Sequence, residues 1–337
     1  MNLSTVPHQY IDRNSLQVIT EKPIGDRTIQ FIYNTLRESA PTMFRVLVSG
    51  KMSSLLGYFH YDMPGKTKNC GKELFNRLGV DWQECVEPPE FYDSHRKFFE
   101  RQIRYWETRP MNSQSTTVVS PADSRVLIGS FTEISTLFIK DKFFDLQELL
   151  GPESLWCSPF IGGDFAVFRL TPDKYHYNHV PVSGRVVAAY NVDGRYHSCN
   201  PSALISMASL YSKNRRVVTI IDTDVEGGSL IGLVAMVEIV ALMIGDIVQS
   251  YSEERYENPQ DVRPGQMVQR GCPKSLFRPG SSTVVLVFEP GRISFAEDLV
   301  KNSQRRDVQS RFTSGFNRPL VETDVLVRSL IAGPLSH

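Results

Sequence analysis

The stretch FRPGSSTVVLVFEPG, residues 277–291, decides the fold of the second half of the chain. Its centre, TVVLVFE, is rich in β-branched and aromatic residues and lies between two Pro-Gly pairs, which are turn signals. The pattern predicts a buried strand that is entered through a tight turn carrying Ser281 and Ser282. Because turn serines usually cap stray backbone groups, this stretch alone favours a structural role for both hydroxyls.

Similar short runs recur along the chain after Pro110. They are rich in valine, they are separated by Gly, Pro, Asp and Asn, and they include GRVVAAYNV (184–192) and RRVVTIIDTDV (215–225). Evenly spaced short strands of this kind are typical of sandwiches and barrels. We therefore predict a mainly antiparallel β sandwich or barrel-like domain over residues 109–337.

The first third of the chain has helical periodicity instead. Apolar residues recur three and four apart between about residues 28 and 107, for example in TIQFIYNTLRES and SHRKFFERQIRYWE. We expect an N-terminal region of amphipathic helices over residues 1–108, and hence an α+β protein. The apolar residues around 44–59, with Arg45 and Lys51 nearby, favour packing on the core, and contact with a membrane surface is the alternative.

The segment SLIGLVAMVEIVALMIGDIV, residues 229–248, has the length of a transmembrane helix. It carries Glu238 near its centre, and a central carboxylate costs about 2.5–3.5 kcal/mol on membrane insertion. The segment is also rich in valine and isoleucine and contains glycines. Two buried strands of a soluble core are therefore the preferred interpretation.

Composition sets limits on the class of protein. The chain has 337 residues, of which 41% are apolar, and its 37 basic and 37 acidic residues cancel, so no global field attracts nucleic acid. The five cysteines are scattered without a CxxC pair, which indicates neither a disulfide framework nor a zinc site. The opening residues lack the pattern of a secretory signal peptide, so we expect a cytoplasmic protein.

Three motifs in the β-rich half carry side chains suited to chemistry. They are SPAD (120–123), YHYNHVP (175–181) and the double serine. Ser, His and Asp together can supply a nucleophile, a base and a group that orients the base. Each residue alone has a structural explanation, and the two histidines lack the third ligand that a metal site needs.

In this order and at these separations, the three motifs resemble those of the phosphatidylserine decarboxylase family. The resemblance extends to FYDSHRKFFERQIRYWETRP (91–110), to RYHSCNP (195–201), and to VRPGQMVQRGCPKSLFRPGSST (262–283), which matches the family's run before its serine without a gap. Matched in this way, the family's processed serine falls on Ser282. The resemblance thus offers a chemical role for a hydroxyl that the turn alone does not explain.

The resemblance implies that the chain cleaves itself at this serine and converts it into a pyruvoyl group, so that no pyridoxal phosphate is needed. It implies His179 as the base that takes the proton of the Ser282 hydroxyl, and Asp123 as the residue that holds the ring of His179. It implies that His176 serves substrate binding or proton transfer. On an extended strand, two histidines three residues apart point to opposite faces, so only one of them faces the serine unless the segment turns.

The sequence also departs from the family pattern. Gly280-Ser281-Ser282 stands where two glycines usually precede the serine, Ser275 stands where glycine is usual, and the arginine usual between the histidines is missing. A glycine before the scissile bond eases strained backbone angles. Cleavage is therefore expected either between Ser281 and Ser282, as the strand register favours, or between Gly280 and Ser281.

The resemblance implies conversion of phosphatidylserine to phosphatidylethanolamine and carbon dioxide. It implies a protein that is peripheral on the inner face of a membrane, and a homodimer is expected. Two alternatives stay open: a pyruvoyl-dependent decarboxylase of a free amino acid, and a binding module that does not process itself.

Overall fold

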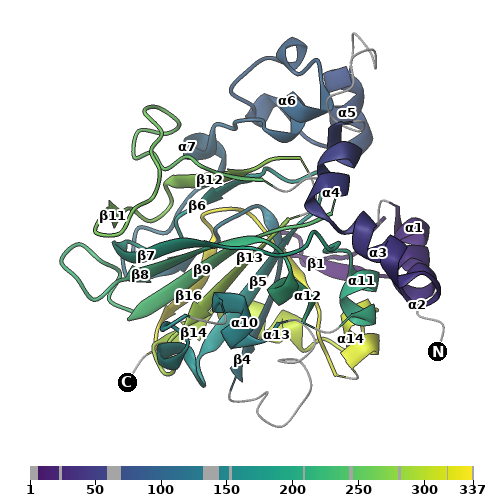
Figure 1. Ribbon diagram of the computed structural model, residues 1–337. Coiled ribbons are helices and arrows are strands. Elements are labelled where there is room, and N and C mark those ends of the chain that lie inside the picture. Colours follow the sequence, from purple (N-terminus) through teal and green to yellow (C-terminus); the bar gives the residue numbers. More distant parts are fainter. Residues whose placement is uncertain are drawn as a thin grey trace.

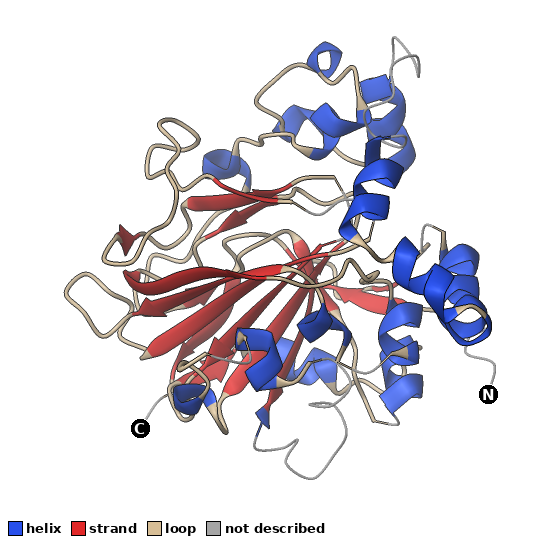
Figure 2. Ribbon diagram, in the orientation of Figure 1, coloured by secondary structure: helices blue, strands red, loops and turns tan. Residues whose placement is uncertain are grey.

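The computed structural model describes residues 7–22, 25–58, 70–131, 144–151, 154–207, 209–242, 246–279, 282–316 and 318–335. At its centre lies a ten-stranded sheet, with helices against one face and two three-stranded sheets against the other (Figures 1 and 2). Its strands, in spatial order, are β11 (Met267–Val268), β7 (Gly184–Val192), β8 (Arg216–Asp222), β9 (Leu233–Val240), β13 (Ser282–Phe288), β5 (Asp164–Leu170), β4 (Ser124–Ser130), β15 (Thr323–Val325), β1 (Gln9–Asp12) and β2 (Val18–Thr20).

The main sheet is open, because β11 and β2 are its two edge strands. Its neighbouring strands are antiparallel, except for β1 beside β15, which are parallel. The α+β class and the mainly antiparallel sheet are confirmed, and the arrangement is a layered sandwich, not a closed barrel. The smaller sheets consist of β10 (Ile247–Gln249), β12 (Pro273–Phe277) and β6 (Tyr177–His179), and of β14 (Ile293–Phe295), β16 (Leu330–Pro334) and β3 (Val118–Val119).

STVVLVF, residues 282–288, forms β13 in the middle of the main sheet; the strand thus begins one residue earlier than the predicted run TVVLVFE and ends at Phe288. All seven of its residues pair with β9 on one side and with β5 on the other. Val285 and Val287 pack on the helical face, whereas Val284, Leu286 and Phe288 pack on the face that the smaller sheets cover. This alternation assigns Ser282 to the same face as Val284, toward the smaller sheets.

Helices account for more than half of the described residues in the N-terminal region, and the predicted N-terminal helices are thus confirmed. They are α1 (Asp26–Gln30), the π-helical η2 (Phe31–Leu36), α2 (Arg37–Ser39), α3 (Pro41–Leu47), α4 (Gly50–Gly57), α5 (Cys70–Leu78), the short 3-10 turns η4 (Trp82–Glu84) and η5 (Pro89–Phe91), α6 (His95–Phe99) and α7 (Tyr105–Thr108). The region also contributes β1 and β2 to the main sheet, which the periodicity did not predict. The later helices are α10 (Leu146–Leu150), the 3-10 turn η6 (Ser158–Phe160), α11 (Pro201–Ser206), α12 (Leu210–Lys213), α13 (Glu297–Ser303) and α14 (Arg311–Phe316).

A buried ionic network ties the first strands to the core of the sheet. The guanidinium of Arg169 donates to both carboxylates, 2.7 Å from Glu21 and 2.6 Å from Glu322. His8 Nε2 lies 2.8 Å from Glu322. The carboxylates and the imidazole lie close enough to resemble a metal site, but the guanidinium already supplies the positive charge there. The network is therefore a structural link between β1, β5 and β15.

The apolar segment at residues 229–248 forms strands, as predicted. It contains β9, which is buried in the main sheet, and the start of β10 in a smaller sheet. Within the described part of the chain, no helix combines the length and apolar character that crossing a bilayer requires.

Candidate functional site

Asp123 lies at the end of the SPAD turn, directly before β4, and is 4% exposed. Arg109 donates from Nε to Oδ1 at 3.0 Å and from Nη2 to Oδ2 at 2.8 Å, and the Val327 N–H donates to Oδ1 at 2.7 Å. Burial favours the neutral carboxyl, yet the Arg109 guanidinium and these hydrogen bonds hold the pKa of Asp123 below its ordinary value. The carboxylate is thus ionised and held in one orientation.

His179 ends β6 and is fully buried. Its Nδ1 lies 2.8 Å from the carbonyl oxygen of Gly271, and its Nε2 lies 3.0 Å from the hydroxyl of Tyr175. Burial, and to a smaller extent the charge of Arg328, lowers the pKa of His179 to about 3, so the ring is neutral. Because a carbonyl can only accept, Nδ1 carries the proton and Nε2 is the basic nitrogen.

His176 directly precedes β6 and is also fully buried. Its ring lies against that of Phe99, with 3.7 Å between centroids. Burial and the nearby charge of Arg101 lower the pKa of His176 to about 3. Neither ring nitrogen has a hydrogen-bond partner among the described residues. His176 is therefore a neutral imidazole with both nitrogens available.

Ser282 is the first residue of β13 and is 1% exposed. It pairs with Val240 of β9 and with Leu170 of β5. Its hydroxyl has no hydrogen-bond partner in the described part of the chain. The interpretation that this hydroxyl merely caps a backbone group therefore finds no support. Gly280 and Ser281, which complete the predicted cleavage site, lie outside the described residues.

The fold brings the three motifs together. The backbone N–H of His179 donates to the carbonyl of Pro121 in SPAD at 2.7 Å, so that turn and β6 are neighbours. The backbone N–H of Phe277, near the double serine, donates to the carbonyl of His176 at 3.0 Å. His179 is paired instead with Pro273, at the other end of β12. Along the β6–β12 pairing, His176 is thus nearer than His179 to residues 277–279, which lead toward Ser282.

The side chains of the expected triad are not joined by hydrogen bonds in the described structure. Asp123 binds Arg109 and the backbone of Val327, while the ring of His179 is held by Gly271 and Tyr175. The charge of Asp123 nevertheless acts on both histidines and favours their protonated forms.

Sequence reasoning missed the groups that hold the site in place. Arg109 was visible only as the end of a helical segment, and nothing in its spacing identified it as the partner of Asp123. Tyr175 was visible within the histidine motif, but its hydroxyl also lies 2.8 Å from that of Tyr256, a residue 81 positions later. Contacts at such separations leave no local signal in one sequence.

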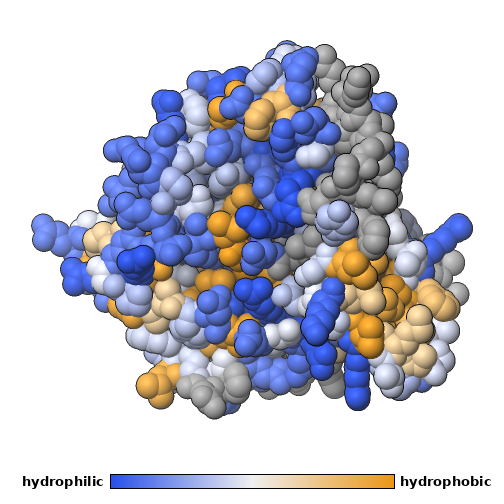
Figure 3. Space-filling view, turned by 45° about the horizontal axis from the view of Figure 1, so that its top comes forward, coloured by the Kyte–Doolittle hydropathy of each residue, from blue (hydrophilic) through white to orange (hydrophobic). Residues whose placement is uncertain are grey.

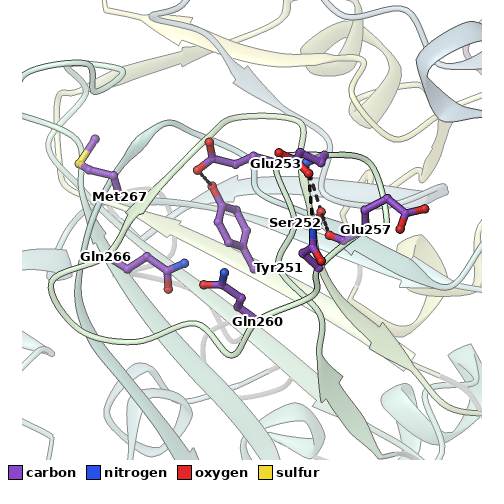
Figure 4. A pocket seen from close by; sticks show the side chains of 9 residues that line it. Tyr251, Ser252, Glu253, Glu257, Gln260, Gln266 and Met267 are labelled. Carbon is purple, nitrogen blue, oxygen red and sulfur yellow. Dashed lines mark hydrogen bonds between the residues drawn. The ribbon is translucent and has the colours of Figure 1, made fainter.

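A separate pocket lies in the loop before β12 (Figure 4). Figure 4 shows the hydroxyl of Tyr251 directed at Glu253, to which it donates at 2.7 Å. The lining also includes the carboxylates of Glu254 and Glu257. None of the residues predicted from the motifs lines this pocket, so it is distinct from the histidine and serine site.

Comparisons with known proteins agree with the motifs. The family model described as phosphatidylserine decarboxylase matches residues 95–313, a range that contains all three motifs. The phosphatidylserine decarboxylase proenzyme of Chlamydia trachomatis is 31% identical over 293 residues, which cover 86% of this chain and 90% of that protein. The proenzyme of the same name from Fusobacterium nucleatum is 28% identical over 309 residues, or 91% of this chain and 95% of the relative. This chain therefore belongs to the phosphatidylserine decarboxylase family.

Proposed function

We propose that this protein is a self-processing phosphatidylserine decarboxylase whose Ser282 becomes a pyruvoyl group. The observation that carries the proposal is the buried hydroxyl of Ser282, which has no hydrogen-bond partner among the described residues and lies at the start of the central strand. Burying a hydroxyl without a hydrogen bond costs free energy, so such a group invites a functional explanation. The name of the bacterial relatives as proenzymes supports the same conclusion.

In the proposed processing, Ser282 Oγ attacks the carbonyl carbon of Ser281, and the peptide C–N bond breaks as an ester forms. Elimination of the ester releases the upstream chain, and hydrolysis of the new terminus releases ammonia and leaves a pyruvoyl group. A pyruvoyl group here supplies a carbonyl that binds the substrate amine and accepts the electron pair left when carbon dioxide departs. This chemistry takes the place of pyridoxal phosphate.

We assign the removal of the Ser282 proton to His179, because its ring is neutral and the lone pair of Nε2 can therefore accept a proton. Asp123 supports the step by charge, as it favours the protonated ring that forms. His176, whose ring nitrogens have no hydrogen-bond partner in the described part of the chain, is assigned to the substrate. The contact between Tyr175 and Nε2 must open during processing, since one nitrogen cannot accept two protons.

A surface on the N-terminal helices supports contact with a lipid bilayer. Its apolar members are unusually exposed: Phe31, Met43, Val46, Leu55 and Tyr58, each close to half exposed or more. Arg27, Arg45 and Lys51 are exposed on the same segments. Figure 3 shows an apolar patch at the right of the molecule, the side on which Figure 1 places α1, α2 and α3. We call this set the helical apolar surface and propose that it holds the protein on the cytoplasmic face of a membrane.

The predicted division at residue 108 and the homodimer both remain proposals. Light scattering of the purified protein tests the homodimer directly.

A free amino acid is the second candidate substrate, and one observation favours it. The residues between the two histidines supply no positive charge for a phosphate: Tyr177 packs in an aromatic cluster, and Asn178 donates to the buried carboxylate of Glu238 at 3.1 Å. The structure thus leaves the phosphate of a lipid headgroup without a cation at this position.

The experiment that tests the function has two parts. Mass spectrometry of the purified, denatured protein should give two chains, the smaller of which begins with a pyruvoyl group derived from Ser282. The processed protein is then incubated separately with phosphatidylserine vesicles and with free amino acids, and carbon dioxide is measured. A single intact chain contradicts processing, whereas release from free amino acids alone assigns the second candidate substrate.

A further inference from the structure

Glu238 is a charged residue in the middle of the central sheet. It lies on β9, is 0% exposed, and is flanked along its strand by Val237 and Ile239, which are equally buried. A carboxylate in such surroundings requires partners. Three donors reach it: Lys274 Nζ at 2.6 Å, Asn178 Nδ2 at 3.1 Å and the hydroxyl of Ser275.

These donors come from the small sheet that covers this face of the main sheet. Lys274 and Ser275 lie on β12, and Asn178 lies on β6 between the two histidine positions. Lys274 is 1% exposed, and its ammonium also donates to Gln249 Oε1 at 3.2 Å. We refer to Glu238, Lys274, Ser275 and Asn178 as the Glu238 cluster.

A β-bulge allows two consecutive residues of β12 to reach the same carboxylate. Pro273 pairs with His179 and Ser275 pairs with Asn178, so that Lys274 is an extra residue with no partner of its own on β6. In a regular strand, Lys274 and Ser275 would point to opposite faces. The bulge instead aims both toward Glu238, which is the use of bulges near functional sites.

The Glu238 cluster lies beside Ser282. Glu238 pairs with Val284, and Val240 pairs with Ser282, so all four side chains share one face of the sheet. Glu238 and Ser282 are diagonal neighbours, a relation in which two residues lie roughly 7–8 Å apart and their Cβ atoms somewhat closer. The carboxylate therefore joins the strand of the serine, through β9, to the strand of the histidines.

A gain in folding stability does not explain why Glu238 and Lys274 form a buried ion pair. Apolar residues of similar volume often match or exceed the stability that a buried ion pair provides, whereas the pair specifies one arrangement of the strands that carry it. We propose that Glu238 and Lys274 are positioning residues, which hold Asn178, and with it His176 and His179, at the position over β13 that self-cleavage at Ser282 requires. This inference rests on the proposed processing at Ser282.

The test replaces the pair by apolar residues and compares rates of self-cleavage. The Glu238→Leu, Lys274→Met double variant should keep a Tm no lower than that of the wild type, but should cleave at least tenfold more slowly. Lys274→Arg keeps the charge and should retain most of the rate. The matched control is the exposed pair Glu297 and Lys301, changed in the same way, which should cleave like the wild type.

A second variant separates positioning from folding. Asn178→Ala removes the link from β6 and leaves the ion pair intact, so it should slow cleavage to a similar extent. Adding it to the double variant should slow cleavage no further, because both changes break one link. A merely structural role predicts instead that the rate follows the folded fraction and that the effects add.

The outcomes separate this inference from the proposed function. If the wild-type chain never cleaves, the proposed function fails and this inference fails with it. If the wild type cleaves, and the double variant and Asn178→Ala both cleave as fast as the wild type, only this inference is overturned. If the double variant folds poorly, the cleavage rates of Asn178→Ala and Lys274→Arg are compared instead. Equal cleavage rates in these two variants contradict the inference.

Discussion

The hydroxyl of Ser282, for which the described residues offer no hydrogen-bond partner, directly follows a second serine. Substitutions at the two serines should have different effects on cleavage. Ser282→Ala should leave a single intact chain, because no other hydroxyl occupies the first position of β13. Ser281→Ala should still cleave. Ser281→Gly should cleave about fivefold faster, since glycine relieves backbone strain, which costs about 1 kcal/mol or more at such a position. Masses of the denatured chains over time measure all three.

The position of the cut follows from the same masses. If β13 keeps its pairing with β5 and β9, a slip by one residue would reverse the face of every side chain in it. We therefore expect the cut between Ser281 and Ser282. A small chain that retains Ser282 behind its pyruvoyl group would place the cut between Gly280 and Ser281 and would contradict the register argument.

The two buried histidines differ in their hydrogen bonds, and this difference predicts different losses. His179→Ala should slow self-cleavage by about 10²–10⁴-fold, the usual contribution of a general base. His176→Ala should cleave but should release less carbon dioxide from the substrate. Gel bands report cleavage, and carbon dioxide release reports decarboxylation. If His179→Ala cleaves normally and His176→Ala does not cleave, His176 is the base and His179 serves the substrate. The backbone hydrogen bond between Phe277 and His176, close to Ser282, is consistent with that outcome.

At the scale of elements, the helical apolar surface makes a prediction about membranes. Met43, Val46 and Leu55 are each about half exposed, so changing all three to Gln should cost little folding stability. Each side chain gains about 1 kcal/mol or more when it enters the lipid interface. The triple variant should therefore bind anionic vesicles more than tenfold less tightly in a flotation assay.

The control for flotation is Leu155→Gln, which removes a 93% exposed side chain outside the N-terminal helices. It should float like the wild type. If the triple variant and the wild type float equally well, lipid contact through α3 and α4 is wrong. If neither binds vesicles at low salt, the free amino acid substrate gains support.

Elements built from local patterns were predictable from the sequence, and those built from distant pairings were not. β13 has the composition and turn signals of a buried strand, and the helices have apolar spacings of three and four. By contrast, β1 is only four residues long and pairs with β15 from the far end of the chain. The partners of the site residues also lie well outside any local pattern: Asp123 accepts from Val327, 204 positions later, and Glu238 binds Lys274, 36 positions later. The motifs thus predicted candidate site residues, but the contacts of those residues could be found only from the fold.

At the scale of the whole molecule, the buried histidines should make stability depend on pH. Burial lowers the pKa of His176 and His179 to about 3 and that of His197 to about 4, whereas an unfolded chain keeps the ordinary value near 6.5. Below pH 6.5 the unfolded chain therefore binds more protons than the folded one. Stability is fully present above pH 6.5 and is lost as the pH falls toward the folded values, by at most about 1.4 kcal/mol per pH unit for each histidine.

His176→Leu isolates one of these contributions. In a Ser282→Ala background, so that both proteins remain single chains, urea unfolding is measured at intervals from pH 7.5 to pH 4.5. Replacing His176 shifts the free energy of unfolding by a constant amount at every pH. The decrease in that free energy between pH 6.5 and pH 4.5 should in addition be about 2 kcal/mol smaller than in the protein with His176, because one histidine fewer takes up a proton on unfolding. Carboxylates whose pKa is lowered in the fold, such as Asp123, lose their contribution mainly below this window. Parallel curves for the two proteins would mean that His176 takes up protons equally well in the folded chain, and the assignment of a neutral, buried imidazole beside the processing site would be wrong.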